Sequence, residues 1–182
     1  MRFVLIDRIL ELTPGHDIVA VKNLTLAEEY LADHFPGFPV MPGVLMLEAL
    51  TQAGAWLIRE TEDFAHSVIV LKAAKTIKYG SFVEPGRQLQ IRAQIVEHGP
   101  SETSFKGEGV IDDQVMVKGR FTLTRYNLRE KNPTLVGTDA SIVAGLRDLY
   151  ATLRKGSVGA RAMVRIAGSG PKSLALSSGP PT

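Results

Sequence analysis

Short apolar runs separated by turn residues cover most of the first 125 positions. Residues 8–12 and 18–22 are two such runs, and the Pro14-Gly15 turn between them predicts a β-hairpin. Over residues 88–95 apolar and polar side chains alternate, which is the pattern of a strand with one exposed face. Similar runs predict four strands in succession, at residues 67–82, 88–95, 104–111 and 114–125.

The segment between these two groups of strands has a different pattern. Residues 42–58 are apolar around almost the whole helical circumference, which predicts a helix enclosed by other structure. Pro42 suits the first helical position, because its missing N–H costs nothing there. The run is short for a membrane span of about 20 residues, and Glu48 and Gln52 interrupt it. We therefore expect an α+β fold in which a curved antiparallel sheet wraps around a long central apolar helix.

From residue 126 onward the pattern changes again. Asn132-Pro133 interrupts regular structure. An apolar stripe and a basic end then predict a helix over about residues 139–155. The stripe consists of Ile142, Val143, Leu146, Leu149, Tyr150 and Leu153. We expect this helix to dock on its own domain, or alternatively on a partner or neighbouring subunit. The Gly-, Ser-, Ala- and Pro-rich residues after 157 predict a disordered tail. The chain thus divides into a domain at 1–125 and a C-terminal extension at 126–182.

Composition narrows the classes of protein. The chain has 182 residues, of which 45% are hydrophobic, enough for one compact core. It has no cysteine, which excludes disulfides, thiolate metal sites and a cysteine nucleophile. Asp7 and Arg8 follow the first apolar residues at once, so no signal-peptide core forms, and no run spans a bilayer. We expect a cytoplasmic protein.

The charge is unevenly distributed. Residues 1–125 hold 13 Lys/Arg and 16 Asp/Glu, a net charge of −3, whereas residues 126–182 hold 8 and 3, a net charge of +5. Nucleic-acid binding would require a clustered basic face with aromatic residues or a known motif. The sequence has neither, so we expect no nucleic-acid partner.

A cramped loop precedes the central helix, and one carboxylate stands inside that helix. Pro36, Gly37 and Pro39 lie within four positions, which predicts a rigid, irregular loop over residues 34–41. Burying the unpaired carboxylate of Glu48 would be costly unless its pKa rises or a partner is present. From the residues alone, structural pairing and proton transfer remain equally open for Glu48.

The segment HFPGFPVMPGVLMLEALTQAG, residues 34–54, carries a resemblance to a known family. It is similar to the signature of the FabZ-type β-hydroxyacyl-acyl-carrier-protein dehydratases, short enzymes with a hot-dog fold. In that family the histidine that opens the motif and a glutamate on the following helix are the catalytic pair, and these positions are His34 and Glu48. A weaker resemblance covers roughly residues 4–125 and leaves the last third of the chain outside it.

The resemblance implies dehydration of a (3R)-hydroxyacyl carrier thioester to its trans-2-enoyl product in fatty acid biosynthesis, with no metal or organic cofactor. Histidine suits the base that removes a proton beside the carbonyl, and a desolvated glutamate suits the acid. The free amides at a helix N-terminus suit the developing oxyanion. We expect His34 as base, Glu48 as acid or as orienter of the leaving water, the Gly43 amide as oxyanion donor, and Phe35 and Phe38 lining an apolar acyl tunnel.

The resemblance also implies partners. In the family the histidine and glutamate come from opposite subunits, so a homodimer or a trimer of dimers is expected, acting on acyl carrier protein. The family's arginine-rich segment is here reduced to one cation, Lys78, and docking would then rely on Lys75, Arg87 or the basic tail. Asp33 replaces a glycine beside His34, where it could alter the approach to the histidine or hydrogen-bond its ring.

Two other functions remain possible. One is a different hot-dog enzyme, either a thioesterase or a dehydratase that also isomerises the double bond. The isomerising relatives carry aspartate where Glu48 stands, and thioesterases lack the continuous motif, so both fit less well. The other is a non-catalytic family member that binds acyl carriers.

Overall fold

The computed structural model describes residues 3–35 and 37–155. Pro36 of the predicted loop and the predicted disordered tail after residue 157 lie outside the described residues. The main elements are β1 (Arg8–Thr13), β2 (Asp17–Asn23), α1 (Gly43–Thr61), β3 (Val68–Tyr79), β4 (Gln88–His98), β5 (Glu102–Ile111), β6 (Gln114–Tyr126) and α2 (Val136–Arg154). Short 3₁₀ turns lie at Glu29–Leu31, Leu128–Glu130 and Pro133–Leu135.

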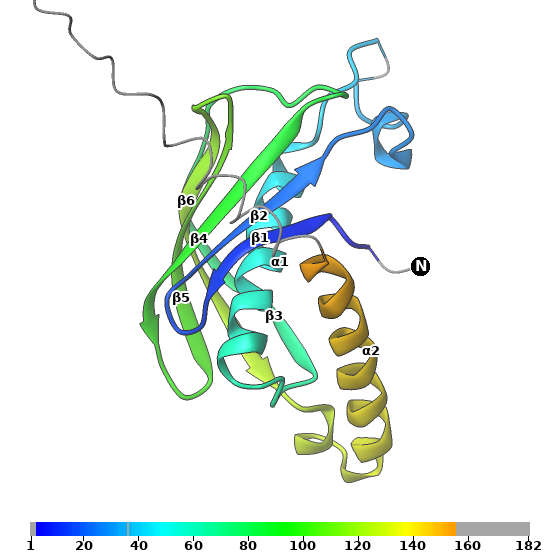
Figure 1. Cartoon of the computed structure of the whole chain (residues 1–182), viewed down its shortest axis with the longest axis vertical. Helices are drawn as coiled ribbons and strands as arrows, with labels where there is room; N and C mark the ends of the chain where they lie inside the picture. Colours follow the sequence, from blue (N-terminus) through cyan, green and yellow to red (C-terminus); the bar gives the residue numbers. More distant parts are fainter. Residues whose placement is uncertain (1–2, 36, 156–182) are drawn as a thin grey trace, which may run out of the picture.

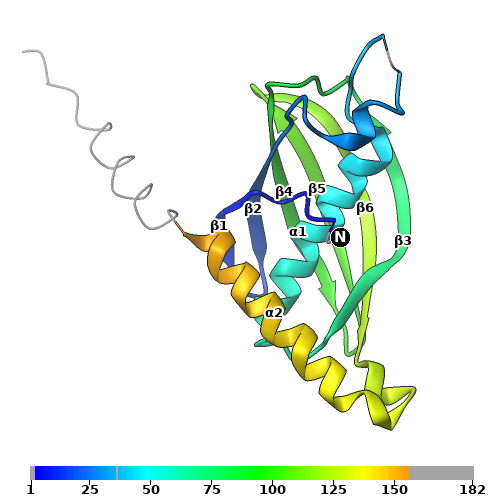
Figure 2. The same cartoon turned by 90° about the vertical axis from the view of Figure 1, so that its right-hand side faces the viewer.

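The strands form one six-stranded antiparallel sheet in the order β1-β2-β4-β5-β6-β3. The sheet curves around α1, as Figures 1 and 2 show, which confirms the predicted α+β architecture with a hot-dog arrangement. β3 follows α1 in the chain but pairs only with β6, so it forms one edge of the sheet. Its outer side presents unpaired backbone groups, which favour pairing with another strand.

The central helix is enclosed along most of its length. Its small residues allow close contact with the sheet: a Cβ on Gly54 would lie 3.1 Å from the Phe121 ring. Burial is complete from Ala53 to Ile58. The prediction that the helix is enclosed on all sides is wrong for one face of its N-terminal half, where Val44 is 68% exposed and Glu48 is only half-buried, while Met46, Ala49 and Leu50 are buried.

The C-terminal helix docks on its own domain, the first of the two alternatives. Figure 2 shows α2 crossing the open side of the sheet beside α1. The Tyr150 ring packs against Trp56 at 5.9 Å and against Phe64 at 5.5 Å between centroids, and Leu153 is buried. α2 begins at Val136, three residues before the predicted start, so Asp139 lies within its first turn and accepts hydrogen bonds from Ser67 and Leu128. The division at residue 125 stays a prediction.

None of the helices described in 3–35 and 37–155 is long and apolar enough to cross a membrane.

Candidate active site

His34 lies on the loop between the Glu29–Leu31 turn and α1, with its side chain half-buried. Its ring packs against Phe35, with 4.4 Å between centroids. Phe35 has φ of 51°, a left-handed conformation that non-glycine residues rarely adopt and that concentrates at functional sites. Asp33 is exposed, and no hydrogen bond joins it to the His34 ring within the described protomer.

The start of α1 presents two free backbone amides. Pro42 is the residue before the helix, not its first residue as predicted, and its carbonyl accepts from the Leu45 and Met46 amides at 2.9 and 3.3 Å. In the described part of the chain, the Gly43 and Val44 amides have no acceptor. Such amides at the positive end of a helix stabilise developing negative charge. The sequence analysis did not predict the Val44 amide as a donor. It could have done so, because the first amides of any helix have no acceptor within the helix.

Gly43 is held close to a strand of the sheet. A Cβ at this position would lie 3.0 Å from Cε1 of Tyr79, the last residue of β3. The tyrosine ring therefore fixes the start of α1 against the edge strand. Phe82, three residues further on, meets Phe38 edge-to-face at 5.6 Å between centroids.

Glu48 is oriented by a single neighbour. The Gln52 Nε2 donates to Glu48 Oε1 at 3.0 Å and to the Phe3 carbonyl at 3.1 Å, while Gln52 Oε1 accepts from the Leu5 amide at 2.9 Å. Because the Leu5 amide fixes the carboxamide, its NH₂ group must face Glu48. Within residues 3–35 and 37–155 no cation pairs with Glu48, so structural pairing with a charge is not observed. Sequence reasoning treated Gln52 only as an interruption and missed this role.

One protomer does not bring the two predicted catalytic residues together. Among the residues that the structure describes, no hydrogen bond or ring contact joins His34 to Glu48, and His34 does not line the cavity that contains Glu48. Phe35 and Phe38 are 55% and 47% exposed, so they do not line an enclosed tunnel within the protomer. Their role as lining residues stays a prediction. No group of described His, Asp and Glu side chains could hold a metal ion.

Glu48 lies at one end of a cavity of about 400 Å³ between α1 and α2. Six residues of α1 form one wall: Glu48, Thr51, Gln52, Ala55, Trp56 and Arg59. The opposite wall comes from the N-terminal segment, β3 and α2, through Phe3, Val4, Ile69, Ile142, Leu146 and Leu149.

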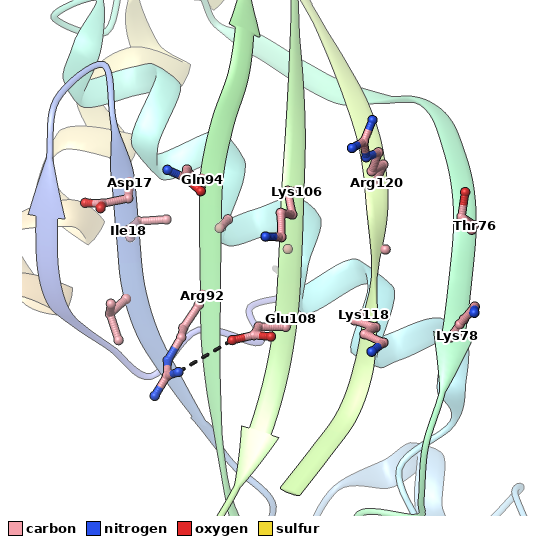
Figure 3. Close-up of a pocket in the computed structure, with 14 residues that line it drawn as sticks. Asp17, Ile18, Thr76, Lys78, Arg92, Gln94, Lys106, Glu108, Lys118 and Arg120 are labelled. Carbon is pink, nitrogen blue, oxygen red and sulfur yellow. Dashed lines mark hydrogen bonds and ion pairs between the residues drawn. The ribbon is translucent and has the colours of Figure 1, made fainter. Parts of the chain in front are cut away.

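A second hollow, of about 580 Å³, lies on the sheet face that turns away from α1 (Figure 3). Cations from four strands gather there: Lys78, Arg92, Lys106, Lys118 and Arg120. Arg92 pairs with Glu108 at 3.5 Å, and the other four form no ion pair with any described residue. The reduced basic segment around Lys78 is thus supplemented by strands distant in sequence. Arg87, predicted as a docking cation, instead pairs with Asp112 at 3.3 Å.

Comparison with known proteins gives matches over about the first two thirds of the chain. A family model for the FabA-like domain matches residues 1–120. The chain is 42% identical over 118 residues to the 3-hydroxyacyl-[acyl-carrier-protein] dehydratase FabZ of Desulfotalea psychrophila, covering 64% of this chain and 79% of that protein. It is 38% identical over 124 residues to the Myxococcus xanthus protein of that name, covering 67% and 81%.

A solved structure shows the same fold. The chain resembles the dehydratase heterocomplex ApeI:P from Xenorhabdus doucetiae, with a TM-score of 0.60, 18% identity, and coverage of 73% of this chain and 90% of that one. At this identity the likeness concerns the fold alone.

Proposed function

The chain belongs to the FabZ-type 3-hydroxyacyl-[acyl-carrier-protein] dehydratases of the FabA-like family, and from this premise we propose its reaction and the residues that carry it. The enzyme removes water from a (3R)-hydroxyacyl group on acyl carrier protein and leaves the trans-2-enoyl group, in fatty acid biosynthesis. The observation that supports this best is Glu48, an oriented carboxylate about 7 Å along the helix axis from the free Gly43 amide.

The elimination assigns one step to each group. His34 takes a proton from the carbon beside the thioester carbonyl, and the electrons of that C–H bond form the new double bond as the C–O bond at the next carbon breaks. Glu48 donates a proton to the departing hydroxyl, which leaves as water. The Gly43 and Val44 amides stabilise the negative charge that develops on the carbonyl oxygen. His34 then holds the extra proton and Glu48 is ionised, so exchange with solvent restores both.

We propose that the site is completed by a second copy of the chain, with His34 from one protomer facing Glu48 of the other. The absence of contact between them in the described protomer supports this arrangement. Large apolar side chains also stay exposed around the start of α1 and along β3, as interfaces require: Phe35, Phe38, Val44, Val70, Leu71, Tyr79 and Phe82. The unpaired edge of β3 lies beside them. The assembly is a dimer or three such dimers.

We propose that the carrier protein, which is acidic, docks on the second hollow, here called the cationic hollow because Lys78, Arg92, Lys106, Lys118 and Arg120 line it. The sheet register sets Lys106 opposite Arg120 and Lys78 opposite Lys118, which also has the acidic Glu108 opposite it on β5. Like charges directly opposite one another destabilise a sheet, so an anionic partner would relieve this cost. Thr76, two residues before Lys78, has φ of 55°, which is a strained backbone conformation for a β-branched residue. We propose that the enzyme acts in the cytoplasm, together with its carrier-bound substrate.

The test is the ultraviolet absorbance of the enoyl thioester formed from a 3-hydroxyacyl carrier protein. We expect signal from the wild type and a loss of at least about a hundredfold in His34→Ala and in Glu48→Gln, since acid–base groups contribute about 10² to 10⁴. Circular dichroism controls for folding of the variants. Release of free thiol without enoyl product would indicate a thioesterase and overturn the proposal.

A further inference from the structure

The cavity between α1 and α2 begins at the proposed catalytic acid and continues away from the proposed oxyanion site. Its α1 wall follows one helical face from Glu48 to Arg59, a distance of about 16 Å along the axis. Gly43 lies one and a half turns before Glu48, in the opposite direction. A substrate with its carbonyl oxygen at Gly43 and its hydroxyl-bearing carbon at Glu48 would therefore direct its remaining carbons into this cavity.

Half of the wall facing α1 lies outside the matched family domain. Ile142, Leu146 and Leu149 lie on one face of α2, and all three line the cavity. α2 lies beyond residue 120, where the match to the FabA-like family model ends. The middle of the cavity is apolar on both sides, since Ala55 and Trp56 face these three side chains. An apolar slot with polar groups at its ends suits an alkyl chain.

A cation marks the far end of the cavity. The Arg59 guanidinium lies 5.1 Å from the Trp56 ring centroid, and its Nε is buried without a hydrogen-bond partner in the described residues. Burial lowers the pKa of Arg59 to about 10. No carboxylate of the described residues pairs with it. An alkyl chain that reached this group would strip it of further solvation, which is unfavourable for a charged group.

We propose that this cavity binds the acyl chain of the substrate, with α2 as its outer wall and Arg59 as its end, so that chains of medium length are preferred. The inference rests on the proposed function and extends it to chain-length selection by a helix outside the matched family domain. Each methylene buried in the apolar part adds about fourfold to binding, up to the length at which the chain meets Arg59.

The first experiment measures kcat/KM for carrier thioesters of increasing length with wild type and two variants of α2. Leu146→Phe fills the cavity, whereas Ala144→Phe places the same side chain on the exposed face of the same helix. We expect Leu146→Phe to lower kcat/KM for a ten-carbon substrate about tenfold and to leave a four-carbon substrate within about twofold, because the added ring takes the space of the distal carbons alone. Ala144→Phe should keep the wild-type profile. Equal losses at all lengths, or no change, would overturn the inference.

A substitution of Arg59 tests the far end of the cavity. Arg59→Met keeps an unbranched apolar stem and removes the charge. We expect the longest accepted substrate to lengthen and its kcat/KM to rise several-fold, about fourfold for each added methylene. A profile unchanged from wild type would show that Arg59 does not limit the chain.

A binding measurement separates failure of this inference from failure of the proposed function. Trp56 is the only tryptophan in the chain and lines the cavity, so its fluorescence reports occupancy directly. We expect saturable change with decanoyl-N-acetylcysteamine, which cannot be dehydrated, and weaker binding in Leu146→Phe than in Ala144→Phe. Enoyl formation without any such binding overturns the cavity assignment alone. Binding without enoyl formation for any chain length overturns the proposed reaction and leaves the cavity as an acyl site.

Discussion

At the scale of single residues, the orientation of Glu48 depends on contacts distant in sequence. Gln52 can face Glu48 only because the Leu5 amide, 47 positions away, fixes its carboxamide. The motif was enough to predict Glu48, His34 and Gly43 as site residues, and their catalytic roles stay predictions. The i,i+4 spacing of Glu48 and Gln52 on a helix allows this pair, but no local pattern shows that the N-terminal segment fixes the Gln52 carboxamide.

Gly43 offers a test at this scale. In Gly43→Ala the new Cβ would lie 3.0 Å from the Tyr79 ring, so either the ring or the start of α1 must move. We expect kcat to fall about tenfold or more, because misplacement by an ångström can cost about a hundredfold.

The matched control is Gly137→Ala, in the first turn of α2, where a Cβ would meet nothing within 4 Å. It should keep wild-type kcat. Full activity in Gly43→Ala would contradict the role given to the start of α1.

At the scale of elements, α2 illustrates what periodicity can predict and what it cannot. The stripe from Ile142 to Leu153 was sufficient to place a helix, and its docking on the domain is confirmed, with Leu153 buried and Tyr150 packed against Trp56. The hydrogen bonds that hold the start of α2 in place were not predictable. The buried Asp139 carboxylate accepts hydrogen bonds from the Ser67 hydroxyl at 2.5 Å and from the Leu128 and Arg129 amides at 2.9 and 3.0 Å. These donors come from two segments, the residue just before β3 and the Leu128–Glu130 turn, which only the fold brings together.

The hydrogen bonds of Asp139 predict that the folded state loses stability in acid. Burial raises the pKa of Asp139, but the hydrogen bonds from Ser67, Arg129 and Leu128 outweigh burial, and the net effect lowers the pKa. The folded state therefore gains stability from Asp139 above the ordinary carboxyl pKa of about 3.9, and loses it as pH falls through the lower folded value.

Thermal unfolding between neutral pH and pH 3 measures this effect. Asp139→Asn should lower the melting temperature at neutral pH and show a shallower loss in acid than wild type. The control is Asp148→Asn, on an exposed position of the same helix, which should follow the wild-type curve. Identical acid dependence in wild type and Asp139→Asn would contradict the assigned role.

At the scale of the whole molecule, the sheet order creates a charged surface that the sequence conceals. Residues 1–125 carry a net charge of −3, yet the curved sheet gathers Lys78, Lys106, Lys118 and Arg120 on one face. These residues lie on β3, β5 and β6, and the pairing of β3 with β6 is a long-range feature that no local pattern specifies. The sequence therefore predicted the presence of a sheet and a helix but not this face.

Charge reversal tests the docking role of this face. The double variant Lys118→Glu, Arg120→Glu should raise KM for a carrier-bound substrate at least about tenfold, since attraction between charged surfaces raises association rates by about 10 to 10³. Turnover of an N-acetylcysteamine thioester should stay within about twofold of wild type. Arg8→Glu, on the opposite edge strand, is the control. Equal losses with both substrates would argue against docking here.

The central claim is that one active site needs His34 from one protomer and Glu48 from the other. Its most direct test uses His34→Ala and Glu48→Gln chains, co-expressed with different tags and purified by both tags in succession. Such a heterodimer contains one intact site and one doubly defective site. The account predicts about half of wild-type enoyl formation from the heterodimer and almost none from either homodimer. No recovery of activity in the purified heterodimer would contradict it.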